Sequence, residues 1–214
     1  MAEQDIKTIY EQTLAKMTDL TDRQKAVLRA ALKLFAAQGF EATTTAQIAA
    51  EAGVASGSVY KHFNNKQGLL MAVLSPLFQG TLMTVADEFI DENFNDEYLS
   101  VEQFIKAIVT DRLYFISNNF QELKLLFGQV LANEAFKSEL IEFLKNQLNK
   151  SAIVEIKRMQ TAGIMVDLPI DIIFQLLFGM AIGYFGKLIA GINLRSIDEE
   201  IELVNTLLIR ALKK

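Results

Sequence analysis

The chain has 214 residues, a net charge of −5, one histidine and no cysteine. The missing cysteines exclude disulfides, thiolate chemistry and zinc sites built on cysteine. Residues 1–12 have neither a basic start nor an apolar segment, so we expect no signal peptide and a cytoplasmic protein. With two prolines, long segments of helical apolar spacing and no alternating strand pattern, the sequence predicts an all-α fold.

Residues 1–20 form an amphipathic extension. Ile6, Tyr10, Met17 and Leu20 lie near one face at helical spacing, with Leu14 beside them. The segment is acidic, which does not fit an arm that binds the minor groove of DNA. We interpret it as a helix that is either frayed or docked on the core.

Helix-start and helix-stop signals then follow one another closely. Thr21 with Gln24 forms a capping box for a helix that ends at Gly39. Thr44 with Gln47 forms a second capping box, which starts the short helix before Gly53. Gly53 ends that helix, since glycine takes a left-handed backbone without a Cβ clash.

Another short helix is predicted after the Gly53 turn, over residues 56–63, with Val59 and Phe63 on one face. Lys66 opens the helix after it. Two short helices joined by a glycine turn indicate a helix-turn-helix, whose second helix fits the major groove of DNA. The pattern alone is equally compatible with an ordinary helical hairpin.

The run closely resembles the DNA-binding domain of the TetR family of transcriptional repressors. The matching residues are Gly39-Phe40, Thr43-Thr44, Ile48-Ala49, Gly53-Val54, Gly57-Ser58-Val59-Tyr60, His62-Phe63 and Lys66. The resemblance implies an N-terminal three-helix helix-turn-helix domain over residues 21–75 and a larger helical ligand-binding and dimerisation domain over residues 76–214. The chain departs from the family at Ala55, where a capping serine is common, and at Ala46 and Gln47.

The charge is unevenly distributed along the chain. Residues 21–75 hold six basic and three acidic side chains, a net charge of +3, whereas residues 76–214 hold 13 basic and 19 acidic ones, a net charge of −6. An acidic surface repels DNA, so residues 21–75 are the plausible footprint of double-stranded DNA. Because +3 is only modestly basic, two copies would bind better than one.

The resemblance assigns the contacts to a DNA operator. We expect Thr45, Tyr60, His62 and Lys66 to hold phosphates, because the amides of a helix start already attract anions near Lys66. We expect Ser56, Gly57, Ser58 and Lys61 to face base edges. Lys61 is the strongest candidate for base readout, since a lysine donates to guanine O6 and N7.

The remaining segments also have helical spacing. Pro76 either starts a new helix or kinks a continuing one, which favours a domain boundary near residue 75. Ser100 with Gln103 and Ser196 with Glu199 are further capping boxes. The expected helices cover residues 76–94, 100–117, 120–133, 136–162, 167–190 and 196–213.

Residues 172–186 form a strongly apolar stretch with one polar side chain, Gln175. A membrane-spanning helix needs about 20 apolar residues, so we expect no membrane partner. Small residues at this spacing let another helix approach closely. By resemblance, the last two helices would pair with those of a second subunit in a homodimer, through Gly179, Gly183, Gly186, Leu203 and Leu207. The alternative is a buried core helix of a monomer.

Phenylalanine and methionine are frequent in the middle helices, and most such residues pack in a core. The resemblance favours an inducer pocket among them for a small apolar or amphipathic effector. The candidate lining residues are Phe78, Met83, Phe104, Tyr114, Phe115, Phe127 and Met159. Because histidine and cysteine ligands are missing, we expect no metal site and no cofactor.

Enzymatic function is disfavoured. The one histidine, His62, lies near Ser58 but has no acid on the same helix, so the pair is not a catalytic triad. No glycine-rich phosphate loop occurs. We therefore interpret the chain as a ligand-responsive repressor that binds a pseudo-palindromic operator as a dimer. A helical protein–protein adaptor without DNA binding is the alternative.

Overall fold

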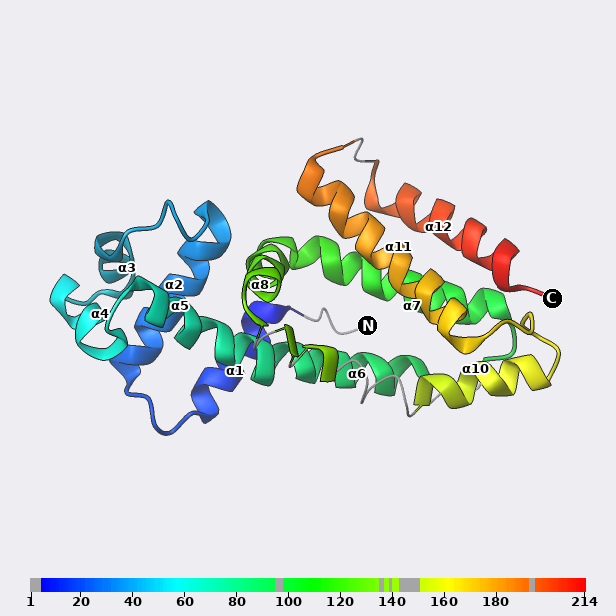
Figure 1. The fold of residues 1–214 in the computed structure, drawn as a ribbon, viewed down its shortest axis with the longest axis horizontal. Coiled ribbons are helices and arrows are strands. Elements are labelled where there is room, and N and C mark those ends of the chain that lie inside the picture. Colours follow the sequence, from blue (N-terminus) through cyan, green and yellow to red (C-terminus); the bar gives the residue numbers. More distant parts are fainter. Residues whose placement is uncertain (1–4, 95–97, 135–136, 139, 143–150, 193–194) are drawn as a thin grey trace. The chain divides into compact units, whose positions relative to one another are not determined.

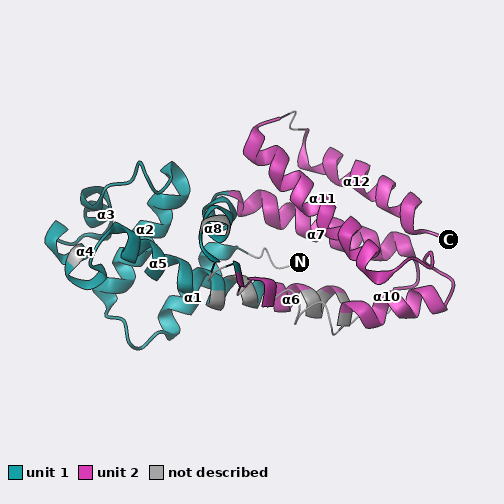
Figure 2. Cartoon of the chain, viewed as in Figure 1, with its two compact units in different colours: residues 1–85, 121–137 teal, residues 86–120, 138–214 magenta. Residues whose placement is uncertain are grey.

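The computed structural model describes residues 5–94, 98–134, 137–138, 140–142, 151–192 and 195–214. The described residues are helical apart from loops and one isolated bridge between Met165 and Lys213, which confirms the all-α prediction (Figure 1). They form two compact units (Figure 2). Unit 1 comprises residues 1–85 and 121–137, and unit 2 comprises residues 86–120 and 138–214. The domain boundary near residue 75 stays a prediction.

Unit 1 is built on the helices that the capping signals predict. Its elements are α1 (Ile6–Lys16), α2 (Asp22–Gln38), α3 (Thr45–Ala52), α4 (Ser56–Phe63), α5 (Lys66–Ser75), the π-helix η1 (Pro76–Leu82) and most of α8 (Phe120–Ala132). Both capping boxes, Thr21 with Gln24 and Thr44 with Gln47, are formed. Leu28, Phe35, Ile48 and Leu70 are buried in the core that α2, α3 and α5 share.

Helix α1 is docked on unit 1 and not frayed. Ile6, Tyr10 and Leu14 are each at most 2% exposed. The hydroxyl of Tyr10 donates to the carbonyl of Val73 at 3.4 Å, and burial raises the pKa of this phenol above its ordinary value. An apolar stripe at helical spacing predicts such docking, because burial removes that stripe from water.

Pro76 does not interrupt the helix as strongly as its ring suggests. A π-helix follows α5 directly and leads into α6 (Met83–Phe94). Gly80 in this π-helix lies against α1, where an added Cβ would come within 2.3 Å of Thr13 Cγ2. The hydroxyl of Thr81 donates to the Pro76 carbonyl at 3.2 Å, which satisfies one carbonyl of the widened turn.

Unit 2 contains most of α6 and the helices α7 (Val101–Asn118), α10 (Ser151–Thr161), α11 (Ile170–Ala190) and α12 (Ile197–Leu212). Helix α7 packs against both α11 and α12. The core of unit 2 contains the buried side chains of Phe104, Val109, Met159 and Leu212. The predicted helix over residues 136–162 lies partly outside the described residues, and α10 is its described end. Helix α11 begins directly after the Asp167-Leu168-Pro169 segment that was expected to initiate it, with Pro169 at its N-cap.

Helix α11 is not the buried core helix that one interpretation of its sequence predicts. By length and composition alone it could cross a membrane. A core helix would be mostly buried, whereas 28% of the most apolar window of α11 is buried. Gly179, Gly183 and Gly186 face open space, since a Cβ built on each would meet no atom within 4 Å. The helix therefore presents an uncovered apolar face within the described residues.

Candidate nucleic-acid interface

The turn between α3 and α4 is fixed by Gly53. Its φ of 67° is left-handed, and its amide bonds to the carbonyls of Ala49 and Ala50. The amide of Val54 then bonds to the Ala49 carbonyl at 3.0 Å, which completes a Schellman-type helix end. Val54 is half-buried in this turn. The glycine therefore sets the direction in which α4 leaves α3, as the sequence predicts.

Helix α3 is held on α2 by a polar network that the sequence analysis missed. Thr43 is 1% exposed, and its hydroxyl donates to the Gly39 carbonyl at 2.8 Å. The Gln38 amide donates to the Thr43 hydroxyl and to Gln47 Oε1, each at 3.2 Å. The available signal was the paired threonine at 43 and 44, since only one of the two can cap the helix.

Helix α4 has one buried and one exposed face. Val59 and Phe63 are 1% and 8% exposed and anchor the helix on unit 1. The opposite face exposes predicted base-reading and phosphate-binding residues, namely Ser56, Gly57, Lys61 and His62. Ser58 is half-buried, as is Thr45 at the start of α3, and the side chain of Tyr60 lies outside the described residues. An exposed polar row on a short, rigidly seated helix suits insertion into a groove.

Ala55, the departure from the family pattern, leaves α4 without a capping side chain at that position. The Ser58 amide instead bonds to the Ala55 carbonyl at 2.8 Å. One of the first amides of α4 is thus satisfied by backbone.

The junction between α4 and α5 depends on residues that the sequence analysis did not single out. Asn64 is left-handed, with a φ of 60°, and Asn65 caps α5 by accepting from the Gly68 amide at 2.7 Å. A Cβ on Gly68 would lie 2.3 Å from the carbonyl oxygen of Phe63. The chain therefore needs glycine here for close backbone approach. An asparagine three residues before a glycine was the signal.

Lys66 is half-buried at the start of α5. Its amine donates to the Glu41 carbonyl at 3.1 Å and lies 4.4 Å from the centroid of the Phe40 ring. The cation therefore lies beside the loop that leads into α3, whose first residue is Thr45. Because Lys66 is only half-buried, its amine can still bind an anion near the starts of α3 and α5.

Ion pairs leave Lys61 available. Lys33 pairs with Glu51 at 2.6 Å, and Arg29 pairs with Glu11 at 2.5 Å. Across the described part of the chain, Lys61 has no ion-pair partner. It thus supplies an uncompensated positive charge on the exposed face of α4, as base or phosphate contact requires.

The candidate effector-pocket residues are divided between the two units. Phe78 and Phe127 belong to unit 1, whereas Phe104, Tyr114, Phe115 and Met159 belong to unit 2. Phe78, Phe104 and Met159 are completely buried, and Phe127 is 37% exposed. The side chain of Met83 lies outside the described residues. A shared pocket stays a prediction, and no group of three metal-ligating side chains occurs in the described ranges.

Known proteins resemble this chain over most of its length. A family model for bacterial regulatory proteins of the tetR family matches residues 27–73. The HTH-type transcriptional regulator SrpR of Pseudomonas putida is 26% identical over 204 residues, which cover 87% of this chain and 82% of that protein. The HTH-type transcriptional repressor AcnR of Corynebacterium diphtheriae is 22% identical over 188 residues, covering 87% and 92%.

A solved structure shares the fold. The transcriptional regulator FadR from Bacillus subtilis, crystallised in complex with stearoyl-CoA, has a TM-score of 0.58 and 20% identity, with 86% of this chain and 97% of that chain covered.

Proposed function

Because this chain belongs to the tetR family of bacterial regulatory proteins and is a DNA-binding transcriptional regulator, we propose that it is a repressor that binds a pseudo-palindromic operator as a homodimer and is released by a small effector. The exposed polar face of α4 carries this proposal. That face presents Lys61 without an ion-pair partner among the described residues, and Val59 and Phe63 seat the helix from behind. Ser56, Gly57, Ser58 and Lys61 read base edges, and Thr45, Tyr60, His62 and Lys66 bind phosphates.

The uncovered faces of α11 and α12 support a dimer. Ile182 on α11 is 65% exposed and Leu207 on α12 is 66% exposed, with Phe178, Ile189 and Leu203 also exposed. Apolar surface of this extent is unusual on a monomer and marks an interaction site. A second copy would cover it with the same two helices, bringing Gly179, Gly183, Gly186, Leu203 and Leu207 into the contact. Two copies of α4 would then reach half-sites centred ~34 Å apart or a multiple of it.

The effector is apolar or amphipathic. Supporting this are the aromatic and methionine side chains of the middle helices and the fact that a structural neighbour, FadR, was crystallised with stearoyl-CoA. Effector binding lowers operator affinity, and by linkage the operator lowers effector affinity by the same factor. The protein acts in the cytoplasm, where its operator is.

In vitro selection of bound duplexes from a random pool tests this function. The expected result is an enriched site with two inverted half-sites, bound less tightly as salt rises. A protein that enriches no sequence and binds no duplex at low salt would instead fit the helical adaptor.

A further inference from the structure

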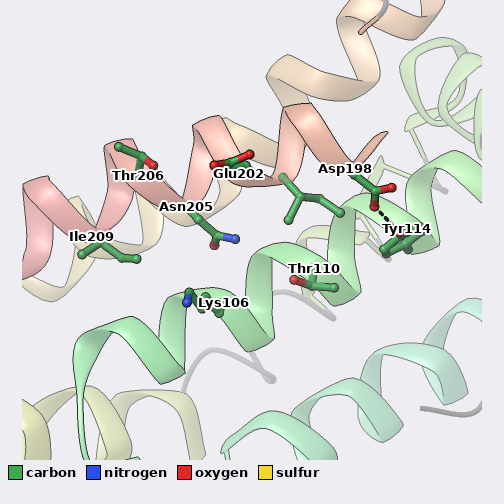
Figure 3. Close-up of a pocket in the computed structure, with 9 residues that line it drawn as sticks. Lys106, Thr110, Tyr114, Asp198, Glu202, Asn205, Thr206 and Ile209 are labelled. Carbon is green, nitrogen blue, oxygen red and sulfur yellow. Dashed lines mark hydrogen bonds between the residues drawn. The ribbon is translucent and has the colours of Figure 1, made fainter. Parts of the chain in front are cut away.

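A groove with a volume of about 500 Å³ lies between α7 and α12 in unit 2 (Figure 3). This volume falls in the range of about 300–1,000 Å³ of small-molecule sites. The two helices run side by side, and Lys106 and Thr110 of α7 lie opposite Asn205 of α12 across it. Of the residues assigned a role so far, Tyr114 alone, a candidate effector-pocket residue, lines this groove.

Asn205 points from α12 into the groove toward α7 (Figure 3). The residue is only 8% exposed, and its Oδ1 is a buried oxygen without a hydrogen-bond partner. Buried polar atoms are nearly always paired, because an unpaired one loses its hydration without compensation. Within the described residues it is the single buried side-chain oxygen or nitrogen in that state. An N–H donor from a ligand would satisfy it.

The lining carries both signs of charge. Lys106 and Glu202 take part in no ion pair within the described ranges, and both are exposed at the groove. Asp198, by contrast, already accepts a hydrogen bond from the Tyr114 hydroxyl at 2.5 Å. The groove therefore offers an unpaired cation on α7 and an unpaired anion on α12. This combination favours a ligand that carries one positive and one negative group.

Two isoleucines give the groove an apolar part. Ile201 and Ile209 lie on α12 one turn before and one turn after Asn205, at i−4 and i+4. Residues at this spacing share one helix face. A ligand held on Asn205 would thus have apolar surface on both sides.

We propose that the groove between α7 and α12 binds an apolar α-amino acid. Its ammonium group donates to Asn205 Oδ1 and pairs with Glu202. Its carboxylate pairs with the Lys106 amine, and its side chain packs on Ile201 and Ile209. The site is separate from the recognition helix, and of the candidate effector-pocket residues only Tyr114 lines it.

Calorimetry of the full-length protein without DNA tests this site, independently of operator binding. The probes are L-leucine, isopentylamine, which lacks the carboxylate, and 4-methylpentanoate, which lacks the ammonium group. We expect leucine to bind and each half-molecule to bind at least about tenfold more weakly, since each lost contact of about 1.4 kcal/mol is tenfold in affinity.

Three variants assign the contacts. Lys106→Met should weaken leucine binding about tenfold or more and leave isopentylamine binding unchanged, because only the carboxylate contact is lost. Asn205→Leu should weaken the binding of both ligands, and its melting temperature should not fall, because a buried oxygen without a partner is removed and the new apolar side chain has a similar size. Lys157→Met, on the exposed side of α10, should change nothing.

Two results would overturn the proposal. One is no heat and no saturation-transfer NMR signal from L-leucine at millimolar concentration. The other is leucine affinity that stays the same in both Lys106→Met and Asn205→Leu.

Discussion

The amine of Lys66 lies 4.4 Å from the centroid of the Phe40 ring, so the first residue of α5 is bound to the loop between α2 and α3. Its hydrogen bond to the Glu41 carbonyl strengthens the same link. The loop leads directly into Thr44 and Thr45, at the start of α3. The two helix starts proposed to hold phosphates are thereby held in one arrangement before DNA arrives, which lowers the cost of ordering them on binding.

Replacing Lys66 tests the phosphate contact. Lys66→Ala should weaken binding to all DNA sequences about equally and reduce the slope of log K against log salt by about one unit, as one fewer counterion is released. Fluorescence anisotropy at several salt concentrations measures this slope. Lys157→Ala in unit 2 is the charge-matched control and should leave it unchanged. An unaltered slope in Lys66→Ala would remove Lys66 from the interface.

Replacing Lys61 tests base readout. Lys61→Ala should relax the preference at one base pair in each half-site, at a cost of about 1–3 kcal/mol for the preferred base. Repeated selection with the variant gives the new consensus. His62→Ala is the matched variant on the same helix face, and it should lower affinity without altering the consensus. If Lys61→Ala also keeps the wild-type consensus, Lys61 binds phosphate.

Gly183 tests the dimer, and the structure sharpens the experiment. A Cβ on Gly183 meets nothing within 4 Å in the subunit, so the side chain of Gly183→Leu would start in open space there. In a tight interface between two copies, the added side chain would overpack the contact and destabilise the dimer by about 1–3 kcal/mol. Sedimentation velocity should show a shift toward monomer, together with weaker operator binding.

Gly128 provides the control for that experiment, since it is an exposed glycine of α8 with equally open surroundings. Gly128→Leu should leave the oligomeric state unchanged. A Gly183→Leu protein that stays fully dimeric would place the small-residue stripe outside the interface. Leu203 and Leu207 on α12 would then be the better candidates for the interface.

The junction before α5 gives a stability prediction. Gly68→Ala should destabilise unit 1 by about 1–3 kcal/mol, because its Cβ would lie 2.3 Å from the Phe63 carbonyl oxygen. Gly57→Ala on α4 meets no atom within 4 Å and should be neutral or stabilising by up to about 1 kcal/mol from helix propensity. Denaturant melts compare the two, and equal stability of both variants would contradict the close approach.

Acid stability reports on the contact between the ends of α7 and α12. The Lys213 amine donates to the Glu102 carboxylate at 2.6 Å and lowers the pKa of Glu102. A lowered folded-state pKa contributes stability above the unfolded-state pKa, and this contribution is lost as pH falls through the folded-state value. Lys213→Met should therefore lose less stability than wild type between about pH 6 and pH 3. Thermal melts across this range measure it, with Lys157→Met as control, and parallel curves would refute the contribution.

Much of unit 1 was predictable because its signals are local. Capping boxes at Thr21 and Thr44 and the turn at Gly53 act within a few residues, and each is formed as predicted. The docking of α1 also follows from its apolar stripe. The Gly68 approach to Phe63 and the buried Thr43 hydroxyl depend on the path of neighbouring segments, which the spacing of apolar residues does not encode.

Unit 2 shows the opposite balance. Its helices follow from apolar spacing and the Ser196 capping box, but the groove at Asn205 arises where α7 and α12 meet, 95 positions apart for residues 110 and 205. Asn205 has no signature in the sequence, since one asparagine in an amphipathic helix is ordinary. The sequence likewise did not decide whether α11 is a buried core helix or an exposed interface helix, because both kinds share the same apolar composition.

Sedimentation of the protein with a duplex that carries its selected site tests the central claim most directly, because it reports DNA binding and assembly together. The account predicts two chains on each duplex at low salt, with free dimer and free duplex appearing as salt rises. A protein that remains monomeric and leaves the duplex free at every salt concentration would contradict it.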